Sequence, residues 1–575
     1  MKRFLFVAAS LLVCCAFLMT ASTAMAGTRP QATATSGAAE AGPGHEVVLS
    51  DLPNITVAEM AGARQAPVAR NPHFTDAEYR ALKLAAPHSG AGTRPQDAPN
   101  AMAPSNQGAN ASALTPGLIA NFYGQFQGCN GSGWTPSDMG LAVNSTYVVQ
   151  AVNECITVYN KTGGIVVAAK DLCTFFGRAP NSGYAGCFDP RAIYDFQANK
   201  FIVIASYKDG NGEGWIDIAA ASNPTLAWTV HHLDMGQALP DYPTIGQTAY
   251  KNNTLNSIIT VCANMYLNAG GFYAQCNLLP KKKVYGTAGF SWPYWYNFTV
   301  GGLIMDTLQP ANVYETEENP RAQYAVNAIN YNGTDGFCTG GSSKGLVVWS
   351  FSDATGSQGS KLGGYYTGCN TSGYNVPGAA DDGQYCTSCV ETIDNRITAT
   401  VHYASGRLYP SIDTYNGWSS AVLGWIVRPY LNDNGGGCTG GVNCATVSGA
   451  TIETEYCYDC GGSYFAEAFF GAQVPTPEND WTMFATFSSY NSNISPGMFV
   501  TSNRVSWPTP FHDGGYFTCQ NNANYTQGRW GDYAAAAPDI PGVGSVPATW
   551  GSGMFIQANG AWGTCISEIR PGNGI

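Results

Sequence analysis

The stretch from Arg191 to Leu233, RAIYDFQANKFIVIASYKDGNGEGWIDIAAASNPTLAWTVHHL, decides the fold class. Four short runs rich in β-branched and aromatic residues lie within it, at 191–195, 201–206, 215–221 and 227–233. Polar turns separate these runs, and no segment shows the 3.6-residue period of a helix. Four such runs in close succession predict an antiparallel meander of four strands.

Similar short runs continue on both sides of this meander, from about residue 115 to the C-terminus. Regular short strands over such a length predict an all-β array of sandwiches or a β-propeller. Loose internal repetition favours the propeller, because propeller blades bury their faces by stacking on neighbours. Asp189-Pro-Arg191 and Asp394-Asn-Arg396 each begin a run of this kind. The length fits six or seven blades, and we favour seven.

The N-terminal residues have the pattern of a secretory signal. Lys2 and Arg3 precede an apolar stretch over 4–19, and Ala24-Met-Ala26 fits a cleavage site, which predicts a signal peptide over 1–26. No later stretch has the roughly 20 consecutive apolar residues that a membrane span needs. We therefore expect a secreted or extracellular β domain over 115–575, with the periplasm or the cell surface as other locations.

Residues 27–114 have a different composition. They are rich in Ala, Pro, Gly and Thr and contain no cysteine. Such a segment buries too little apolar surface to offset the entropy of ordering, so we predict a mostly disordered propeptide or linker. We expect the β domain to fold without it. Within this segment, Thr75 and Glu78 form a capping box, which predicts a short helix near 76–86.

Charge excludes one class of partner. Charged residues make up 11% of the chain and the formal net charge is −12. Nucleic-acid binding requires Lys and Arg against phosphates, so this composition argues against a nucleic-acid partner.

The cysteines predict a disulfide framework. Cys14 and Cys15 lie in the signal, which leaves 16 of the 18 cysteines. A meander brings sequence neighbours into adjacent strands, so we expect near neighbours to pair. The expected pairs are Cys173–Cys187, Cys262–Cys276, Cys338–Cys369 and Cys438–Cys444, followed by Cys129–Cys155, Cys386–Cys389, Cys457–Cys460 and Cys519–Cys565. Metal binding or redox chemistry at the two Cys-x-x-Cys pairs is the alternative.

A calcium loop is one candidate site. Asp209, Asn211 and Glu213 alternate with glycines, and Asp217 follows, so their oxygens could converge on Ca²⁺. The acid expected at position 12 of such a loop is replaced by Ala220. The alternative is a polar hairpin turn. We expect no cofactor other than this Ca²⁺.

An aromatic cluster is a second candidate site. Trp292, Tyr294, Trp295 and Tyr296 lie within five residues. Aromatic faces stack on sugar rings and anchor protein partners, which suggests a binding surface. Packing between blades is the alternative.

Two catalytic arrangements are unfavourable. Gly341-Ser-Ser-Lys-Gly345 matches the serine-hydrolase motif, but it opens a strand where a nucleophile elbow must open a helix. His231 and His232 are adjacent in a predicted strand, so their side chains point to opposite faces and cannot share a metal.

An ordered series of short motifs resembles a known family. These are WTPSDMG from Trp134, DPRAIYD from Asp189, DYPTIG from Asp241 and GRWGDY from Gly528. Together they are similar to bacterial secreted sialidase-like β-propeller proteins, mostly of unassigned function, over about residues 120–570. The resemblance implies a sialidase-like propeller. We expect its charged and aromatic motif residues to be structural: Asp138, Asp189, Arg191, Asp195, Asp241, Arg529, Trp530 and Asp532.

Sialidase activity would require further residues. A sialidase needs an arginine cluster for the substrate carboxylate and a Tyr–Glu pair, and Arg191, Arg321, Arg396 and Arg529 could converge at a propeller centre. The alternative is that each arginine pairs with a nearby Asp or carbonyl. We expect Arg529 and Asp532 to pair and to make the 528–533 segment architectural. The Asp box of sialidases has one imperfect copy, from Ser411 to Trp418.

Three functions remain open at this point. The first is a non-catalytic protein that binds a surface glycan or protein through loops at one end. The second is a glycan-cleaving enzyme of sialidase-like type. The third is a structural or adhesive envelope protein.

Overall fold

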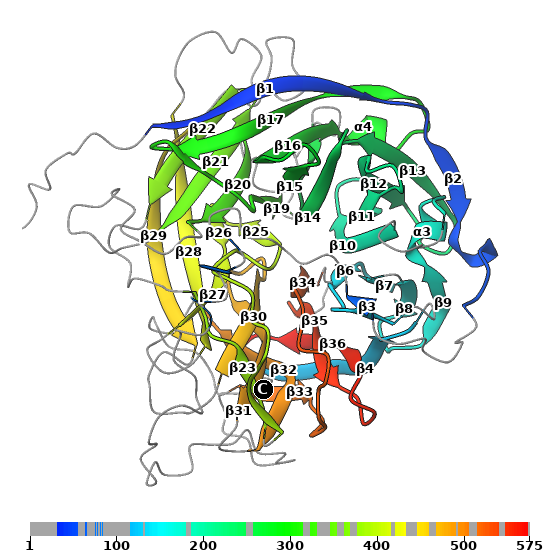
Figure 1. Cartoon of the computed structure of the whole chain (residues 1–575), viewed down its shortest axis with the longest axis vertical. Coiled ribbons are helices and arrows are strands. Elements are labelled where there is room, and N and C mark those ends of the chain that lie inside the picture. The colour runs from blue at the N-terminus through cyan, green and yellow to red at the C-terminus, as the bar shows by residue number, and fades with distance from the viewer. Residues whose placement is uncertain are drawn as a thin grey trace, which may run out of the picture.

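Figure 1 shows the computed structural model, in which β-sheets stand around a common centre. The description that follows covers residues 31–55, 64–65, 75, 77–78, 81, 83, 116–129, 133–153, 155–179, 186–248, 257–313, 322–329, 345–352, 361–367, 376–383, 385–415, 420–432, 446–458, 467–489, 493–504, 515–539 and 547–572. These residues are mostly strands, and the helices α3 (Leu172–Phe175) and α4 (Lys281–Val284) have four residues each.

The predicted four-stranded meander is present. It consists of β10 (Gly186–Asp195), β11 (Lys200–Lys208), β12 (Gly214–Ala221) and β13 (Ala227–Asp234), hydrogen-bonded in that order. Both faces of this sheet are buried. Phe201 and Val203 pack toward the preceding sheet, whereas Ile202 and Ile204 pack toward the following one. The strands are therefore apolar on both faces because each sheet lies between two others.

Most of the remaining strand pairs are also antiparallel. The first sheet contains β6 (Gly140–Val143), β7 (Tyr147–Val152), β8 (Cys155–Asn160) and β9 (Ile165–Asp171). After β13 come β14 (Ala238–Gln247), β15 (Ile258–Leu267), β16 (Phe272–Pro280) and β17 (Phe290–Val300), with β18 (Leu303–Ile304) on β17, and then β19 (Gln309–Val313), β20 (Gln323–Ala328), β21 (Leu346–Ser352) and β22 (Lys361–Thr367).

The C-terminal half repeats this plan. Its sheets contain β25 (Val401–Ala404), β26 (Arg407–Tyr409), β27 (Ser411–Tyr415), β28 (Ser420–Asn432) and β29 (Thr446–Tyr458), then β30 (Glu467–Pro475), β31 (Trp481–Ser489), β32 (Ile494–Asn503) and β33 (Tyr516–Cys519), and last β34 (Ala535–Pro538), β35 (Thr549–Ile556), β36 (Trp562–Arg570) and β4 (Gly117–Phe126). Two small pairs are β3 (Arg64–Gln65) with β5 (Trp134–Thr135), and β23 (Ala380–Asp382) with β24 (Cys386–Val390). Unlike the other pairs, β14 with β19, β19 with β25 and β3 with β5 pair in parallel.

The first strand of each sheet lies toward the centre (Figure 1). Consecutive first strands contact one another in the order β6, β10, β14, β19, β25, β30 and β34, and β34 contacts β6. The last sheet is completed by β4, which comes from the N-terminal side and pairs with β36. This arrangement is propeller-like.

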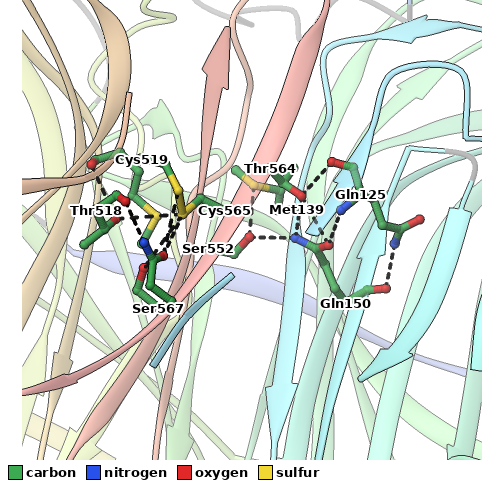
Figure 2. The surroundings of a disulfide bond; sticks show 11 residues. Gln125, Met139, Gln150, Thr518, Cys519, Ser552, Thr564, Cys565 and Ser567 are labelled. Carbon is green, nitrogen blue, oxygen red and sulfur yellow. Dashed lines mark hydrogen bonds between the residues drawn. A yellow bond between two sulfur atoms is a disulfide. The ribbon is translucent and has the colours of Figure 1, made fainter. Parts of the chain in front are cut away.

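Gln150 of β7 joins the first sheet to the last one (Figure 2). Its Nε2 donates to Ser552 Oγ at 2.8 Å and to Thr564 Oγ1 at 3.0 Å, and its Oε1 accepts from the backbone N–H of Gln125 at 3.0 Å. One buried amide thus bonds to β35, β36 and β4, so the seam between the first and last sheets is fixed by specific hydrogen bonds as well as by apolar packing.

The N-terminal segment departs from the prediction of disorder. Strand β1 (Ala32–Ala41) pairs with β17, and β2 (His45–Val48) pairs with β13. Residues 31–55, here named the belt, thus extend two sheets at their outer edges (Figure 1). The physical reason is that an outer strand presents unpaired N–H and C=O groups that an extended segment can satisfy without a core of its own. Composition alone does not reveal such a partner.

The capping box is confirmed. The backbone N–H of Thr75 donates to Glu78 Oε2 at 2.8 Å, and the N–H of Glu78 donates to Thr75 Oγ1 at 3.2 Å. Residues 77, 78, 81 and 83 are helical. The other residues of the predicted helix lie outside those described.

Five of the predicted disulfide pairs are confirmed where the structure describes them, although they do not all join adjacent strands of one meander. The bonds are Cys129–Cys155, Cys173–Cys187, Cys262–Cys276, Cys386–Cys389 and Cys519–Cys565. Cys262 and Cys276 are directly opposite on β15 and β16, as a meander requires. Figure 2 shows the bond that joins β33 to β36. The side chains of Cys338, Cys369, Cys438, Cys444, Cys457 and Cys460 lie outside those described.

Cross-links of this number are typical of proteins that fold outside the cytoplasm. Within the described part of the chain, no helix has the length and apolar character to cross a membrane.

The belt should contribute measurably to stability. Leu49, in the turn η1 (Leu49–Asp51) after β2, is fully buried in the core between the first two sheets. We expect Leu49→Ala to lower the free energy of unfolding by about 2–5 kcal/mol, because it leaves a cavity. The control Ser50→Ala, at an exposed neighbour, should change it by less than about 0.5 kcal/mol. Thermal unfolding of both variants checks this, and equal melting temperatures would show that the belt is dispensable.

Candidate functional site: a buried charge cluster

A repeated bulge begins several of the inner strands. Asp189, Tyr242 and Phe470 have positive φ angles of 54°, 55° and 52°, and the ladder shifts register at each of them. Non-glycine residues rarely adopt this conformation, and bulges re-aim side chains. The bulges direct side chains of β10, β14 and β30 toward a shared region.

Asp138 connects the first sheet to the segment before β34. Its Oδ1 accepts the backbone N–H of Asp532 at 2.8 Å, and its Oδ2 accepts from Asn153 Nδ2 at 2.6 Å. Asp138 is fully buried, two residues before β6 begins. Both carboxylate oxygens therefore serve the junction between the first and last sheets.

Asp189 connects three sheets. Its Oδ2 accepts from the Tyr533 hydroxyl at 2.7 Å and from the Tyr242 N–H at 3.2 Å. The Tyr242 hydroxyl donates to the backbone carbonyl of Asp532 at 2.6 Å. These bonds continue the network of Asp138, so the motif residues of four sheets form one buried cluster. We name Asp138, Asp189, Tyr242, Asp532 and Tyr533, with the arginines below, the charge cluster.

The arginines of the cluster have local partners, as the alternative to a sialidase site predicted. Arg529 pairs with Asp532 at 2.5 Å, and Arg396 makes two bonds to Asp394 at 2.7 and 2.8 Å. Arg191 donates to the carbonyls of Pro243 and Thr398, each at 3.2 Å, and lies 3.6 Å from the Tyr533 ring centroid. Arg321 lies outside the described residues.

Burial determines the protonation of the cluster acids. Burial, together with the charges of Asp241 and Asp532, raises the pKa of Asp189 to about 8. Burial also raises the pKa of Asp138 well above its usual range, with the charges of Asp532 and Asp189 adding to the effect. The cluster therefore retains protons at neutral pH, because several carboxyls compete for the compensation that Arg529 provides.

The other motif residues have separate positions. Trp530 is buried and donates from Nε1 to Thr486 Oγ1 at 2.9 Å. Asp241 is buried at the β14 bulge, near Asp189. Asp195 lies apart from the cluster, where it bonds to Lys281 at 2.8 Å and to the Tyr285 hydroxyl at 2.5 Å.

The residues predicted to bind calcium make other bonds in this structure. Asp209 Oδ1 accepts the backbone N–H groups of Asn211 and Glu213 at 2.8 and 2.9 Å, which closes the turn between β11 and β12. Asp217 lies within β12 and bonds to Arg178 and His232. The four oxygen donors do not converge, so the polar-turn alternative describes them. Elsewhere in the described part of the chain, no group of three His, Cys, Asp or Glu residues is placed to hold a metal.

The aromatic cluster does not form an open surface. Trp292 is buried and donates from Nε1 to Asn277 Oδ1 at 3.0 Å. Tyr294, Trp295 and Tyr296 are half-buried on β17, paired opposite β1. The packing alternative therefore describes these residues, and the belt strand that covers them was absent from the sequence-based prediction.

Sequence reasoning missed several members of the site. Tyr242 and Tyr533 stand within quoted motifs but were not chosen as candidates. Asp413, in the imperfect Asp box, accepts the N–H of Phe470 at 2.8 Å, and burial raises its pKa to about 7. The usable signal is a Pro or Gly directly after the bulge residue, as in Asp189-Pro, Tyr242-Pro and Phe470-Gly.

Two cavities border this region. One lies between the last two sheets, has room for about one water molecule, and is lined by Met139, Met498, Trp530, Tyr533 and Met554 among others. The second is of similar size, lies among the inner strands, and is lined by residues such as Leu141, Ala192, Ile193 and Asn312. Neither cavity is lined by a carboxylate.

Comparison with known proteins identifies no family. No family model matches the chain, and no curated protein matches it. Solved structures overlap loosely. An exo-β-1,3-galactanase from Phanerochaete chrysosporium is 10% identical, with 79% of this chain and 98% of that chain covered at a TM-score of 0.26. The fucose-specific lectin from Aleuria aurantia is also 10% identical, with coverages of 67% and 96% at 0.23. Scores this low carry no argument about activity.

Asp532→Asn should destabilise the protein. Arg529 would remain in the cluster without a charged partner, and breaking a buried ion pair costs roughly 3–5 kcal/mol. We expect a lower melting temperature in thermal unfolding. The control Glu213→Gln, at an exposed turn, should leave it unchanged. If Asp532→Asn melts with the wild type, the pair does not support the fold.

The cluster should also make stability depend on pH. The pKa of Asp189 is raised to about 8 in the folded protein, whereas it is near 4 in the unfolded chain. Its contribution to the free energy of unfolding is therefore fully present below about pH 4 and is lost as the pH rises through about 8. We expect Asp189→Asn to flatten the fall in melting temperature between pH 5 and pH 9. Asn keeps an acceptor oxygen and tolerates the positive φ. Parallel curves for the two proteins would contradict this.

Proposed function

We propose that the protein is a secreted, non-catalytic binding protein with a seven-bladed propeller, whose ligand is an extracellular glycan or protein. The main observation behind this proposal is that the acids of the charge cluster are buried away from solvent. Asp138, Asp189, Asp241 and Asp532 are at most 3% exposed. A glycosidase instead needs two carboxyls facing each other across a substrate gap, about 5–5.5 Å or 6.5–9.5 Å wide.

The blade number is supported by the circuit of first strands. Seven strands, from β6 to β34, contact one another in turn, and β34 returns to β6. Secretion is supported by the signal-like N-terminus and by the five disulfides. The similarity to sialidase-like propellers is supported by the convergence of four separate motifs on one cluster.

Exposed tyrosines supply candidate contacts for a ligand. Tyr123 on β4 and Tyr430 on β28 are 71% and 47% exposed. Tyr presents a large apolar face with a polar tip, which suits both sugars and protein partners. Tyr430 stands on the long β28–β29 ribbon opposite Gly449.

One observation favours a glycan-cleaving enzyme as the second candidate. Arg191 and Arg396 lie over the Tyr242 ring at 5.7 and 4.8 Å, and Arg191 lies over Tyr533. Arginines beside tyrosines are the residue types a sialidase uses. A motion that opened the cluster would be required for substrate to reach them.

A paired assay separates the two candidates. The purified secreted protein is applied to a glycan array and incubated with fluorogenic sialosides and galactosides. We expect binding that falls at least tenfold in Tyr430→Ala or Tyr123→Ala, with no hydrolysis above the buffer rate. Hydrolysis that disappears in Asp189→Asn would establish the enzyme instead. If glycans are neither bound nor hydrolysed, a protein ligand is the remaining candidate. Pull-down with the same variants tests for it.

A further inference from the structure

Three histidines gather where the belt meets the second sheet. His45 begins β2, and its ring stacks on His232 of β13 with centroids 5.3 Å apart and ring planes at 29°. Its Nε2 lies against the backbone of Gly177, where an added Cβ would come within 2.6 Å. The neighbouring His231 points to the opposite face, as the sequence predicted, and its Cε1 lies against Gly44 of the belt. Both faces of β13 thus present a histidine to the belt.

The counter-charges at this junction are balanced when the histidines are neutral. Asp217 of β12 accepts from Arg178 at 2.7 and 2.9 Å and bonds to His232 Nδ1 at 2.7 Å. His231 Nε2 bonds to the carbonyl of Gly286 at 2.7 Å, and its ring lies 5.1 Å from that of Phe290. Among the described residues, His45 has no carboxylate within ion-pair distance, and Glu46 is exposed on the other face of β2.

Protonation would therefore place excess positive charge between the belt and the sheet. One carboxylate, Asp217, already compensates Arg178 and bonds to His232, so protonation of His45 would add a second positive charge near Arg178. Like charges at such a distance repel, and the partly buried site screens them poorly. The main-chain pairing of the belt with β13 spans four residue pairs, from Ala227–Val48 to Val230–His45, and Leu49 beyond it is buried in the core.

We propose that His45, His231 and His232 form an acid-sensitive latch that releases β2 from the edge of β13 while the rest of the β domain stays folded. Release would leave the β13 edge with unpaired backbone groups, which is the type of surface to which another extended segment can add.

The direction of the pH effect follows from the two histidines that burial affects. Burial lowers the pKa of His45, and the charge of His232 lowers it further. Burial also lowers the pKa of His231, against the effect of the Gly286 carbonyl. A histidine whose folded pKa lies below its unfolded value stabilises the docked state above about pH 6.5 and loses that contribution as pH falls. We therefore expect β2 to be released from β13 at acidic pH.

Hydrogen exchange of the full secreted protein tests the latch without any ligand. Amide protection of residues 45–48 is measured at pH 7.5 and pH 5.0 and corrected for the intrinsic exchange rate. We expect it to fall at least tenfold at pH 5.0. Strand β1 is an internal reference, because its partner β17 contains no histidine, and its protection should change less than threefold. The core strand β11 should stay fully protected.

Two variants assign the effect to the histidines. His45→Phe keeps a stacked ring without a titratable proton, and His232→Gln keeps a hydrogen-bonding partner for Asp217. Each should reduce the acid-induced loss of protection in β2 to less than threefold, and His232→Gln decides the matter if His45→Phe fails to fold. The proposal is overturned if wild-type β2 keeps its protection at pH 5.0, if β11 loses protection equally, or if both variants behave as the wild type does.

Discussion

The hydrogen bond from the backbone N–H of Asp532 to the carboxylate of Asp138 is the contact on which the architecture depends. It joins residues 394 positions apart in the chain and ties the segment before the last sheet to the segment that leads into β6 of the first sheet. Gln150 repeats this connection farther out, with bonds to Ser552 and Thr564. In a circular arrangement, the first and last sheets lie side by side although they are far apart in the chain. Specific polar contacts stabilise this junction.

These polar contacts have an electrostatic cost. Burying Asp138 and Asp189 next to Asp532 raises the pKa values of both, so part of the hydrogen bonding depends on retained protons. Arg529 and the tyrosine hydroxyls offset this cost by direct bonds. The bulges at Asp189 and Tyr242 add backbone strain. Such an arrangement is kept because each acid bonds to several sheets at once, whereas an apolar side chain would fill the space without fixing their orientation.

The belt follows a different principle. Its strands contain small residues, such as Gly37 against the Tyr294 ring, and they use the open edges of β13 and β17. Main-chain hydrogen bonds give this docking most of its specificity, with Leu49 as the main apolar anchor. The junction at His45 is therefore the part of the belt where we expect a small change in charge to have the largest effect on docking.

The sequence by itself determined the strand content, the four-stranded meander, the capping box and the five described disulfides. Apart from the Cys519–Cys565 bond, which joins two sheets, these depend on contacts between residues close in the chain, for which local pattern and turn chemistry suffice. Only the tertiary structure decided that the low-complexity belt forms strands, that Trp292 to Tyr296 are covered, and that Asp209 and Asp217 diverge. It also decided that Asp189 meets Tyr533, 344 residues away. The sequence contains both residues, but their meeting depends on how the sheets are stacked around the centre, and that is a property of the whole chain.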